Sequence, residues 1–502
     1  MAQKSLKKNA FLNIFKTFLG VIFPLITFPY SSRILQPDGI GKVNFAQSVI
    51  SYFAIFAALG ISSYGIRESA KLRDDKKLLS KFCKEIFILN CISTAFAYSI
   101  LIITIFFISN FIPYRAVLCV CSATIIFTTI GMDWLYKAEE DYFYITIRHL
   151  FFQILSIIFL FIFVRTKDDY IKYAGIAVFA NVGSNILNFF HSRKYISFRN
   201  CKIENPFKHL KAVLVLFSMS VAISIYTTLD TTMVGLLSSD YQVGLYTAST
   251  KINKIVLQLV TSIGFILMPR LSYYIGKKDF QSFNKLVYKS VDVMFLISIP
   301  CAIGLSVLSE GVILLLSGTH YVQAIPVMRM MNPIIVIIGM GSLLGSQILI
   351  PMGKEKYTLI SEIIGAVSNF TLNLILIPRF HAFGAAIATV SAESLVTATQ
   401  LFFARKYFEV NKFALSFLKY FLNSVIMGII VLISIRLFKT QYSKMIFGIA
   451  VGVITYFLLL VLERNSIIFE ILKSVKQKIN HMYKIFFLPQ KIATSFLFFI
   501  LL

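Results

Sequence analysis

The sequence reads IFILNCISTAFAYSILIITIFFI at residues 86–108, without a single charged side chain. A helix that crosses a bilayer needs about 20 predominantly apolar residues, so this stretch predicts a transmembrane helix. Apolar runs of similar length recur from near residue 10 to residue 463, with only short polar breaks between them. The sequence therefore predicts an all-α polytopic membrane protein.

The composition supports this class and excludes others. Of 502 residues, 57% are hydrophobic and 14% are charged, whereas soluble domains carry roughly 25% charged residues. No polar break exceeds about 20 residues, which is too short for a soluble catalytic domain. The net charge is +26. In a polytopic protein this excess is expected from the positive-inside rule and from attraction to anionic phospholipids, so we do not expect nucleic acid as a partner.

Apolar runs and polar breaks together predict about fourteen transmembrane helices. The expected spans are 10–32, 43–66, 85–108, 115–136, 144–164, 171–191, 212–236, 249–272, 290–316, 323–350, 357–378, 382–405, 414–436 and 444–462. Lys and Arg are concentrated in the second, sixth and eighth of the polar breaks between these spans. Most odd-numbered breaks contain fewer Lys and Arg, although the fifth and the thirteenth weaken this contrast. The alternation predicts an even number of helices and cytoplasmic N- and C-termini.

A weak internal repeat predicts two lobes. Residues 35–46 and 237–248 share a pattern whose glycines, Gly41 and Gly244, lie 203 positions apart. A second pair, at Gly175 and Gly384, is offset by 209 positions. We therefore expect two six-helix lobes related by a pseudo-two-fold axis along the membrane normal, plus an extra helix pair. The expected parts are an N-lobe (1–192), a cytoplasmic linker (193–211), a C-lobe (212–406), the extra pair (407–463) and a cytoplasmic amphipathic tail (464–502).

Short motifs stand out in both halves of the chain. The N-terminal motifs are FPYSSRILQPDGIG (28–41), GISSYGIRESA (60–70) and GMDWLY (131–136). The C-terminal motifs are DTTMVG (230–235), VGLYTA (243–248), NFTLN (369–373), IP (377–378) and GAAIAT (384–389). These motifs resemble those of bacterial polysaccharide and O-antigen repeat-unit flippases, in the multidrug/oligosaccharidyl-lipid/polysaccharide exporter superfamily. The resemblance covers about residues 10–410.

The resemblance implies a flippase of the bacterial inner membrane. Its substrate would be an undecaprenyl-diphosphate-linked oligosaccharide repeat unit, moved from the cytoplasmic to the periplasmic leaflet by alternating access between the lobes. A polysaccharide polymerase and a chain-length regulator would be its partners in polysaccharide biosynthesis. No enzyme activity and no cofactor are implied.

Such a substrate needs a wet cavity with cations for the diphosphate, because unpaired polar groups cost several kcal/mol in hydrocarbon. Ionisable residues inside the spans are therefore the candidates. The predicted substrate-binding residues are Lys16, Lys251, Lys254, Arg67 and Arg270. Lys251 and Lys254 share one helix face at the i, i+3 spacing. Arg67 and Arg270 lie at cytoplasmic helix ends, where anchoring in the headgroups is the simpler interpretation.

Three acidic residues complete the set. Asp230 lies in the outer part of the seventh expected helix, where it either takes part in ion coupling or forms a structural pair with Lys254. Glu393 lies near the expected midplane, where an isolated carboxylate would be expected to bind a proton. It is predicted either to couple transport to an ion or to act as a packing carboxyl. Asp133 lies near the cytoplasmic boundary, where solvation is the simplest expectation.

Two alternatives remain open. A multidrug or cation antiporter of the same superfamily would need an anionic or aromatic pocket, whereas several candidates here are cations. A membrane glycosyltransferase or O-antigen polymerase would need a substantial periplasmic loop, and the odd breaks are short. The six Cys and six His form no metal-binding motif, so no metal site is predicted.

Overall fold

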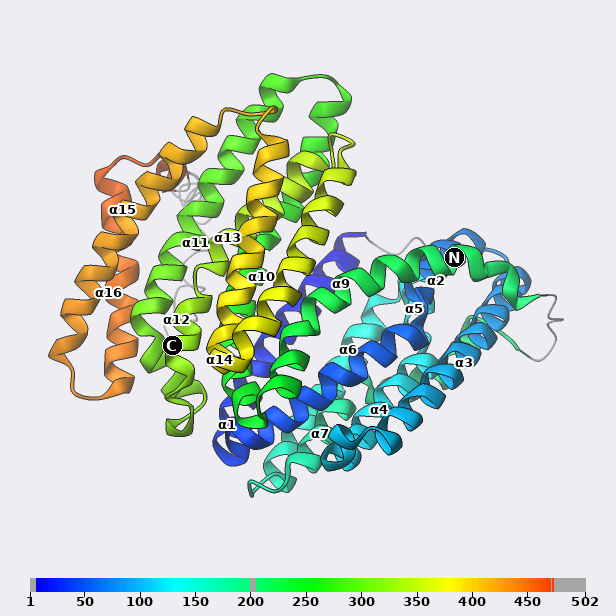
Figure 1. Cartoon of the computed structure of the whole chain (residues 1–502). Coiled ribbons are helices and arrows are strands. Elements are labelled where there is room, and N and C mark those ends of the chain that lie inside the picture. Colours follow the sequence, from blue (N-terminus) through cyan, green and yellow to red (C-terminus); the bar gives the residue numbers. More distant parts are fainter. Residues whose placement is uncertain (1–5, 199–204, 471, 474–502) are drawn as a thin grey trace, which may run out of the picture.

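In the residues that it describes, the computed structural model contains helices and no strands (Figure 1). It describes residues 6–198, 205–470 and 472–473, and only the backbone of 6–19, 21, 219, 222–227 and 262–266. In Figure 1 the N-terminal lobe lies at the lower right and the C-terminal lobe at the upper left. The two lobes meet at the lower centre of the view and diverge toward the upper right, so the predicted two-lobed architecture is confirmed.

The helices divide between the lobes in chain order. The N-lobe contains α1 (Leu6–Ala58), α2 (Ile61–Leu72), α3 (Lys76–Phe107), α4 (Arg115–Gly131), α5 (Asp133–Ala138), α6 (Tyr142–Phe163), α7 (Tyr170–Val178), the π-helix η2 (Phe179–Gly183) and α8 (Asn185–His191). The C-lobe contains α9 (Leu210–Leu237), α10 (Asp240–Gly276), α11 (Phe280–Leu316), α12 (Ala324–Met331), α13 (Ile334–Ser342), the π-helix η6 (Leu343–Leu349) and α14 (Glu355–Ala404). The extra pair, α15 (Val410–Ser434) and α16 (Gln441–Leu462), packs against α11. Short 3-10 turns are η1 (Ser109–Tyr114), η3 (Ser192–Lys194), η4 (Pro206–His209), η5 (Thr319–Tyr321) and η7 (Ile435–Leu437).

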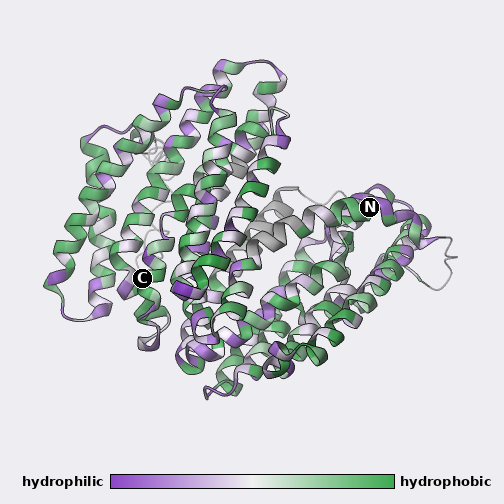
Figure 2. Ribbon diagram, viewed as in Figure 1, coloured by the Kyte–Doolittle hydropathy of each residue, from purple (hydrophilic) through white to green (hydrophobic). Residues whose placement is uncertain are grey.

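Each of the fourteen predicted spans has a helical counterpart in the described part of the chain. Ten stretches there are long and apolar enough to cross a membrane, and two of them, Ile22–Leu72 and Glu355–Ala404, each contain a bend. The partly described α9 and α10 supply the seventh and eighth spans. Hydrophobic residues cover the lengths of the outer helices, while hydrophilic residues concentrate in the connecting loops (Figure 2). This distribution is typical of helices surrounded by lipid.

Two long helices bend at residues with positive φ. α1 leaves helical geometry at Gln36 (φ 57°), directly before Pro37. Proline disfavours helical geometry in the residue before it, which accounts for the bend. α14 also leaves helical geometry, at His381 (φ 51°), which no proline follows. The predicted spans 357–378 and 382–405 are therefore joined by a bend without a loop.

Each of the two glycines of the repeat, Gly41 in the N-lobe and Gly244 in the C-lobe, lies against the backbone of the other lobe. A Cβ atom built on Gly41 would lie 1.8 Å from the carbonyl oxygen of Asp240, and one on Gly244 would lie 2.1 Å from that of Pro37. Adding 203 to positions 41 and 37 gives 244 and 240, so the repeat exchanges the two contacts. The axis that relates the lobes passes between α1 and α10 at this point, and only glycine permits so close an approach.

Further hydrogen bonds join the lobes around these glycines, at the end of the molecule that we call the closed end. Tyr114 donates its hydroxyl to Asp240 Oδ1 at 2.7 Å. Ser32 donates its hydroxyl to the Leu316 carbonyl at 2.9 Å, and the Arg33 guanidinium donates to the carbonyl of Leu315. The first half of α1 is therefore fastened to α11 of the C-lobe.

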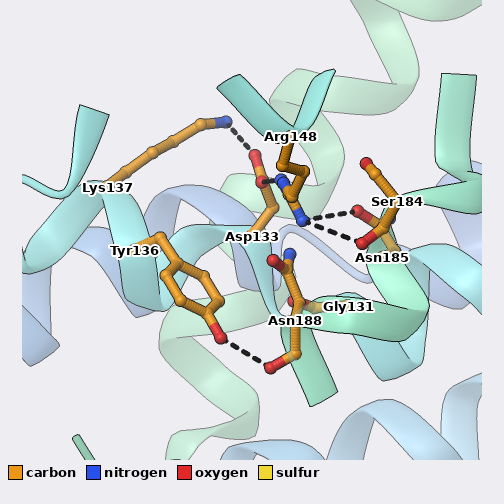
Figure 3. Close-up of polar contacts among 8 residues, drawn as sticks. All are labelled: Gly131, Asp133, Tyr136, Lys137, Arg148, Ser184, Asn185 and Asn188. Atoms are coloured by element: carbon orange, nitrogen blue, oxygen red, sulfur yellow. Dashed lines mark hydrogen bonds and ion pairs between the residues drawn. The ribbon is translucent and has the colours of Figure 1, made fainter. Parts of the chain in front are cut away.

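A buried polar cluster holds α4, α5, α6 and α8 together in the N-lobe (Figure 3). Arg148, 7% exposed, donates to Asp133 Oδ1 at 2.6 Å, and Lys137 lies 3.1 Å from Asp133 Oδ2. Tyr136 donates to the Asn188 carbonyl at 2.5 Å. The expectation that Asp133 is merely solvated is wrong, because the N-lobe places a buried arginine beside it.

The linker and the start of the tail pack against the lobes. In the linker, Lys208 and His209 lie 2.8 Å and 3.1 Å from the carboxylate of the buried Glu85. In the tail, residues 466–470 are helical, and Glu470 forms an ion pair with Lys289 of α11. Most of the predicted amphipathic tail, and residues 199–204 of the linker, lie outside the described residues. The predicted domain boundaries therefore stay predictions.

Candidate functional site

Each lobe contains a cavity beside α10. The C-lobe cavity has a volume of about 350 Å³ and is lined by α9, α10, α12, α13 and α14. The N-lobe cavity has a volume of about 210 Å³ and is lined by both halves of α1, by α6, α7 and η2, and by one residue of α10. Cavities between helices that carry a few polar groups are the usual places for small-ligand sites.

α10 contributes one lysine to each cavity. Lys251 lines the N-lobe cavity, where its Nζ atom lies 5.2 Å from the centre of the Phe28 ring. Lys254 lines the C-lobe cavity. The sequence placed both near the start of a helix beginning at residue 249, but α10 begins at Asp240, where Ser239 caps it by accepting from the Gln242 N–H. Lys251 therefore lies about 16 Å from the N-terminal end of α10 and not near its start.

The surroundings of the two lysines differ in charge. Lys251 is the one ionisable Lys, Arg, Asp or Glu side chain among the described residues that line the N-lobe cavity. Neither lysine forms an ion pair with a described carboxylate within 4 Å. The C-lobe cavity, in contrast, also contains Asp230 and Glu393. The N-lobe cavity is thus the more cationic of the two.

Asp230 is held by four neutral donors. Its Oδ1 atom accepts from Asn369 at 3.0 Å and from Asn373 at 2.7 Å. Its Oδ2 atom accepts from the hydroxyls of Tyr246 and Thr389, each at 2.7 Å. These bonds satisfy the carboxylate without an ion pair to Lys254, and they join α9, α10 and both halves of α14.

Glu393 lines the same cavity and is 9% exposed. It lies twelve residues beyond the bend at His381, in the second half of α14. The structure thus brings Glu393, Asp230 and Lys254 together around one cavity. The assignment of Glu393 and Asp230 to ion coupling or to a structural role stays a prediction.

The remaining predicted residues are placed elsewhere. Arg67 is exposed on α2, forms an ion pair with Glu68 at 2.8 Å and lies over the ring of Tyr64. Arg270 is exposed near the far end of α10. Neither Arg67 nor Arg270 lines the N-lobe cavity or the C-lobe cavity. The side chain of Lys16 lies outside the described residues, although its backbone belongs to α1.

Sequence reasoning missed the carboxamides of the N-lobe cavity, Asn44, Gln47 and Asn181. Single uncharged polar residues in an apolar run give no periodic signal, so nothing in the sequence singled them out. It also missed Arg148, which lies inside the predicted span 144–164. The search for charges within spans that found Lys251 would have found Arg148 as well.

Comparisons with known proteins agree with this architecture. Residues 6–275 match the family model described as polysaccharide biosynthesis protein, and residues 216–375 match the MatE model. A candidate O-antigen transporter of Escherichia coli (strain K12) is 26% identical over 413 residues, covering 80% of this chain and 97% of that protein. A counterpart from Shigella dysenteriae is 24% identical over 416 residues, covering 79% and 99%.

Two solved structures share the fold. The inward closed conformation of the lipid II flippase MurJ has a TM-score of 0.71 at 18% identity, covering 91% of this chain and all of that one. An inward-facing MATE multidrug resistance transporter has a TM-score of 0.61 at 14% identity, covering 76% and 93%. With a family match over more than half of its length and a two-lobed fold of this kind, the chain belongs to the polysaccharide biosynthesis protein family of the multidrug/oligosaccharidyl-lipid/polysaccharide exporter superfamily.

Proposed function

We propose that this multi-pass membrane protein is a flippase for a lipid-linked oligosaccharide. Its substrate is a repeat unit on undecaprenyl diphosphate, which it moves from the cytoplasmic to the periplasmic leaflet of the bacterial inner membrane. The names of the relatives, which describe O-antigen transport and lipid II flipping, support a lipid-linked glycan as substrate. The anionic diphosphate is the part of such a substrate that needs a charged partner.

Lys251 is the observation that carries this proposal. A cation in a cavity within the membrane, with no carboxylate in the described lining, favours an anionic ligand. The same charge disfavours a cationic drug, which argues against a multidrug antiporter. The described loops at the closed end, such as 164–169 and 317–323, are too short for the periplasmic catalytic loop of a polymerase.

Flux in proteoliposomes tests the proposal. Vesicles loaded with polyprenyl-diphosphate-linked glycan should expose their inner-leaflet glycan to an external glycosidase only when the protein is present. Lys251→Gln should lower this flux about tenfold or more, because a charge-assisted hydrogen bond contributes about 1.5–3 kcal/mol. Lys251→Arg should retain more flux than Lys251→Gln, since it keeps the charge.

The matched control is Lys356→Gln, which removes an exposed lysine from the first turn of α14 and should leave flux unchanged. Wild-type flux in Lys251→Gln, at equal protein content, would remove the cationic site from the mechanism. Absence of flux in the wild-type vesicles would contradict the proposed function itself.

We infer that the closed end faces the periplasm in the conformation described here. The lysine-rich breaks lie at the opposite end, which the positive-inside rule assigns to the cytoplasm together with both termini. In a cysteine-free background, Thr319→Cys at the closed end should react with a membrane-impermeant maleimide in spheroplasts. Lys76→Cys should react only after lysis, and the reverse pattern would overturn the orientation. Thr319 and Lys76 are exposed and so accessible to the reagent, whereas the neighbouring serines Ser317 and Ser80 are buried.

A further inference from the structure

A third cavity lies at the lysine-rich end of the N-lobe, and we call it the linker cavity. It has a volume of about 300 Å³ and lies between α2, the first turns of α3 and η4 of the linker. Its lining residues come from positions 64–85 and 208–209, at or beyond the ends of the expected spans 43–66, 85–108 and 212–236. The headgroup layer of a bilayer begins where such spans end, so the linker cavity lies at headgroup depth.

Three lysines from three different elements line the linker cavity. They are Lys71 of α2, Lys81 of α3 and Lys208 of η4. The side chains of Lys71 and Lys208 are 61% and 44% exposed, and Lys81 is half-buried. Like charges that the fold brings together repel one another unless an anion lies between them. The convergence of three ammonium groups therefore favours an anionic ligand.

The two carboxylates of the linker cavity do not balance these lysines. Glu68 pairs with Arg67 at 2.8 Å as well as with Lys71 at 3.0 Å. Glu85, only 1% exposed, pairs with Lys208 at 2.8 Å. Each carboxylate therefore has at least one basic partner of its own, and positive charge is in excess around the cavity. Basic pockets of this kind, at the ends of membrane helices, bind anionic lipid headgroups.

Apolar side chains form the rest of the wall. Leu78 is 50% exposed although it lies at the end of the molecule where lysines are concentrated. Tyr64 and Phe82 are buried beside it, with ring centres 5.9 Å apart. An exposed leucine gains nothing from a free phosphate ion, whereas contact with an acyl chain removes it from water. The linker cavity thus suits an anion that carries hydrocarbon.

Two motifs to which the proposed function assigns no role hold this cavity in shape. GISSYGIRESA contains Gly65, on which a Cβ atom would lie 2.6 Å from the ring of Trp134 in GMDWLY. α2 is thereby packed directly against α5. The hydroxyl of Tyr64, in the first of these motifs, forms a 2.9 Å hydrogen bond with Nδ1 of His209 in the linker. The cavity is therefore built from fixed elements of the N-lobe and the linker.

We propose that the linker cavity binds the phosphate of an anionic phospholipid from the leaflet at the lysine-rich end. Lys71, Lys81 and Lys208 surround the phosphate, and the acyl chains begin beside Leu78. The site lies outside the N-lobe and C-lobe cavities, so it does not depend on which substrate the protein transports. The lipid joins the linker to α2 and α3 at the place where the chain passes from one lobe to the other.

Native mass spectrometry of the full chain in detergent tests this inference. Delipidated protein is titrated with phosphatidylglycerol and with phosphatidylcholine of the same acyl chains. The wild type should bind its first phosphatidylglycerol about tenfold more tightly than its first phosphatidylcholine, as expected for charge-assisted hydrogen bonds. Lys71→Gln/Lys81→Gln should lose this preference and bind phosphatidylcholine as the wild type does. Lys71→Arg/Lys81→Arg, which keeps both charges, should retain it.

The matched control is Lys277→Gln/Lys278→Gln, which removes two exposed lysines at the same end of the molecule but outside the linker cavity. This variant should keep the preference. Equal loss in the two Lys→Gln double variants would show that overall charge attracts the lipid, and the site would be wrong. A wild type without any preference would also overturn the inference.

Two further measurements separate a lipid from a free anion and a binding defect from misfolding. Inorganic phosphate in excess should not displace phosphatidylglycerol, and Leu78→Ala should weaken its binding. Displacement by phosphate together with unchanged binding in Leu78→Ala would mean a free-anion site, and the lipid assignment would be wrong. If Lys71→Gln/Lys81→Gln loses its helical circular dichroism, Lys71→Gln alone should still lower the preference, and wild-type preference in that variant would contradict the site.

Discussion

Alanine at Gly41 or at Gly244 should prevent the closed end from forming and lower flux about tenfold or more. A Cβ atom at these positions would lie 1.8 Å and 2.1 Å from carbonyl oxygens of the other lobe. Backbone atoms cannot turn aside as a flexible side chain can, so the lobes must separate. Overpacking of this kind costs about 1–3 kcal/mol, which shifts a two-state equilibrium about five- to 150-fold.

Cross-linking measures this separation directly. Tyr114 and Asp240 contact each other across the closed end, so cysteines at both positions should be joined by a short bismaleimide in the wild-type background. The cross-linked fraction should fall when Gly41 or Gly244 is replaced by alanine. Gly175→Ala is the matched control, because the nearest atom to its Cβ would be 3.7 Å away. Undiminished cross-linking and flux in Gly41→Ala would show that the glycine contact is not the gate.

Asp133→Asn should destabilise the N-lobe by about 3 kcal/mol, because it leaves the buried Arg148 guanidinium without its charge partner. Only 6% of the Arg148 side chain is exposed, and its Nε atom already lacks a hydrogen-bond partner among the described residues. Its remaining hydrogen bonds, to the Ser184 carbonyl and to Asn185 Oδ1, are both 3.4 Å long. Thermal unfolding in detergent, followed by circular dichroism, measures the loss.

Lys137→Gln provides the comparison within the same cluster. Lys137 pairs with Asp133 at 3.1 Å, but 37% of its side chain is exposed, so its removal should cost less than about 1 kcal/mol. Arg148→Lys should not restore the stability lost in Arg148→Ala, because lysine cannot reproduce the planar fork that reaches three partners. Equal melting temperatures for Asp133→Asn and Lys137→Gln would contradict the assignment of Arg148 as the dominant partner.

The helices could be predicted from the sequence because each span has to bury its own backbone polar groups in an apolar run. The start of α10 could not, since residues 240–248 include polar side chains and pack against α1 instead of lipid. The bend at Gln36 has a local cause in Pro37, whereas His381 is followed by no proline, so the local sequence gives no such signal for its bend. The internal repeat revealed Gly41 and Gly244, but the backbone atoms that they contact appear only when the lobes are assembled.

The candidate site, too, could be predicted from the sequence only in part. Charges inside spans are rare enough to be noticed singly, which is how Lys251 and Lys254 were found. Their separation into two cavities was not predictable, because the i, i+3 spacing placed them on one helix face. The two lobes approach that face from different sides, and only the fold shows which lysine faces which lobe.

The exchange of contacts between Gly41 and Gly244 has the pattern of an isologous interface, in which residue i contacts j and j contacts i across a two-fold axis. In a homodimer one substitution would alter both halves of such an interface at once. Here the two halves are encoded at separate positions of a single chain. A mutation can therefore alter one glycine contact without altering the other, and the two lobes are free to diverge wherever the axis does not bring their backbones together.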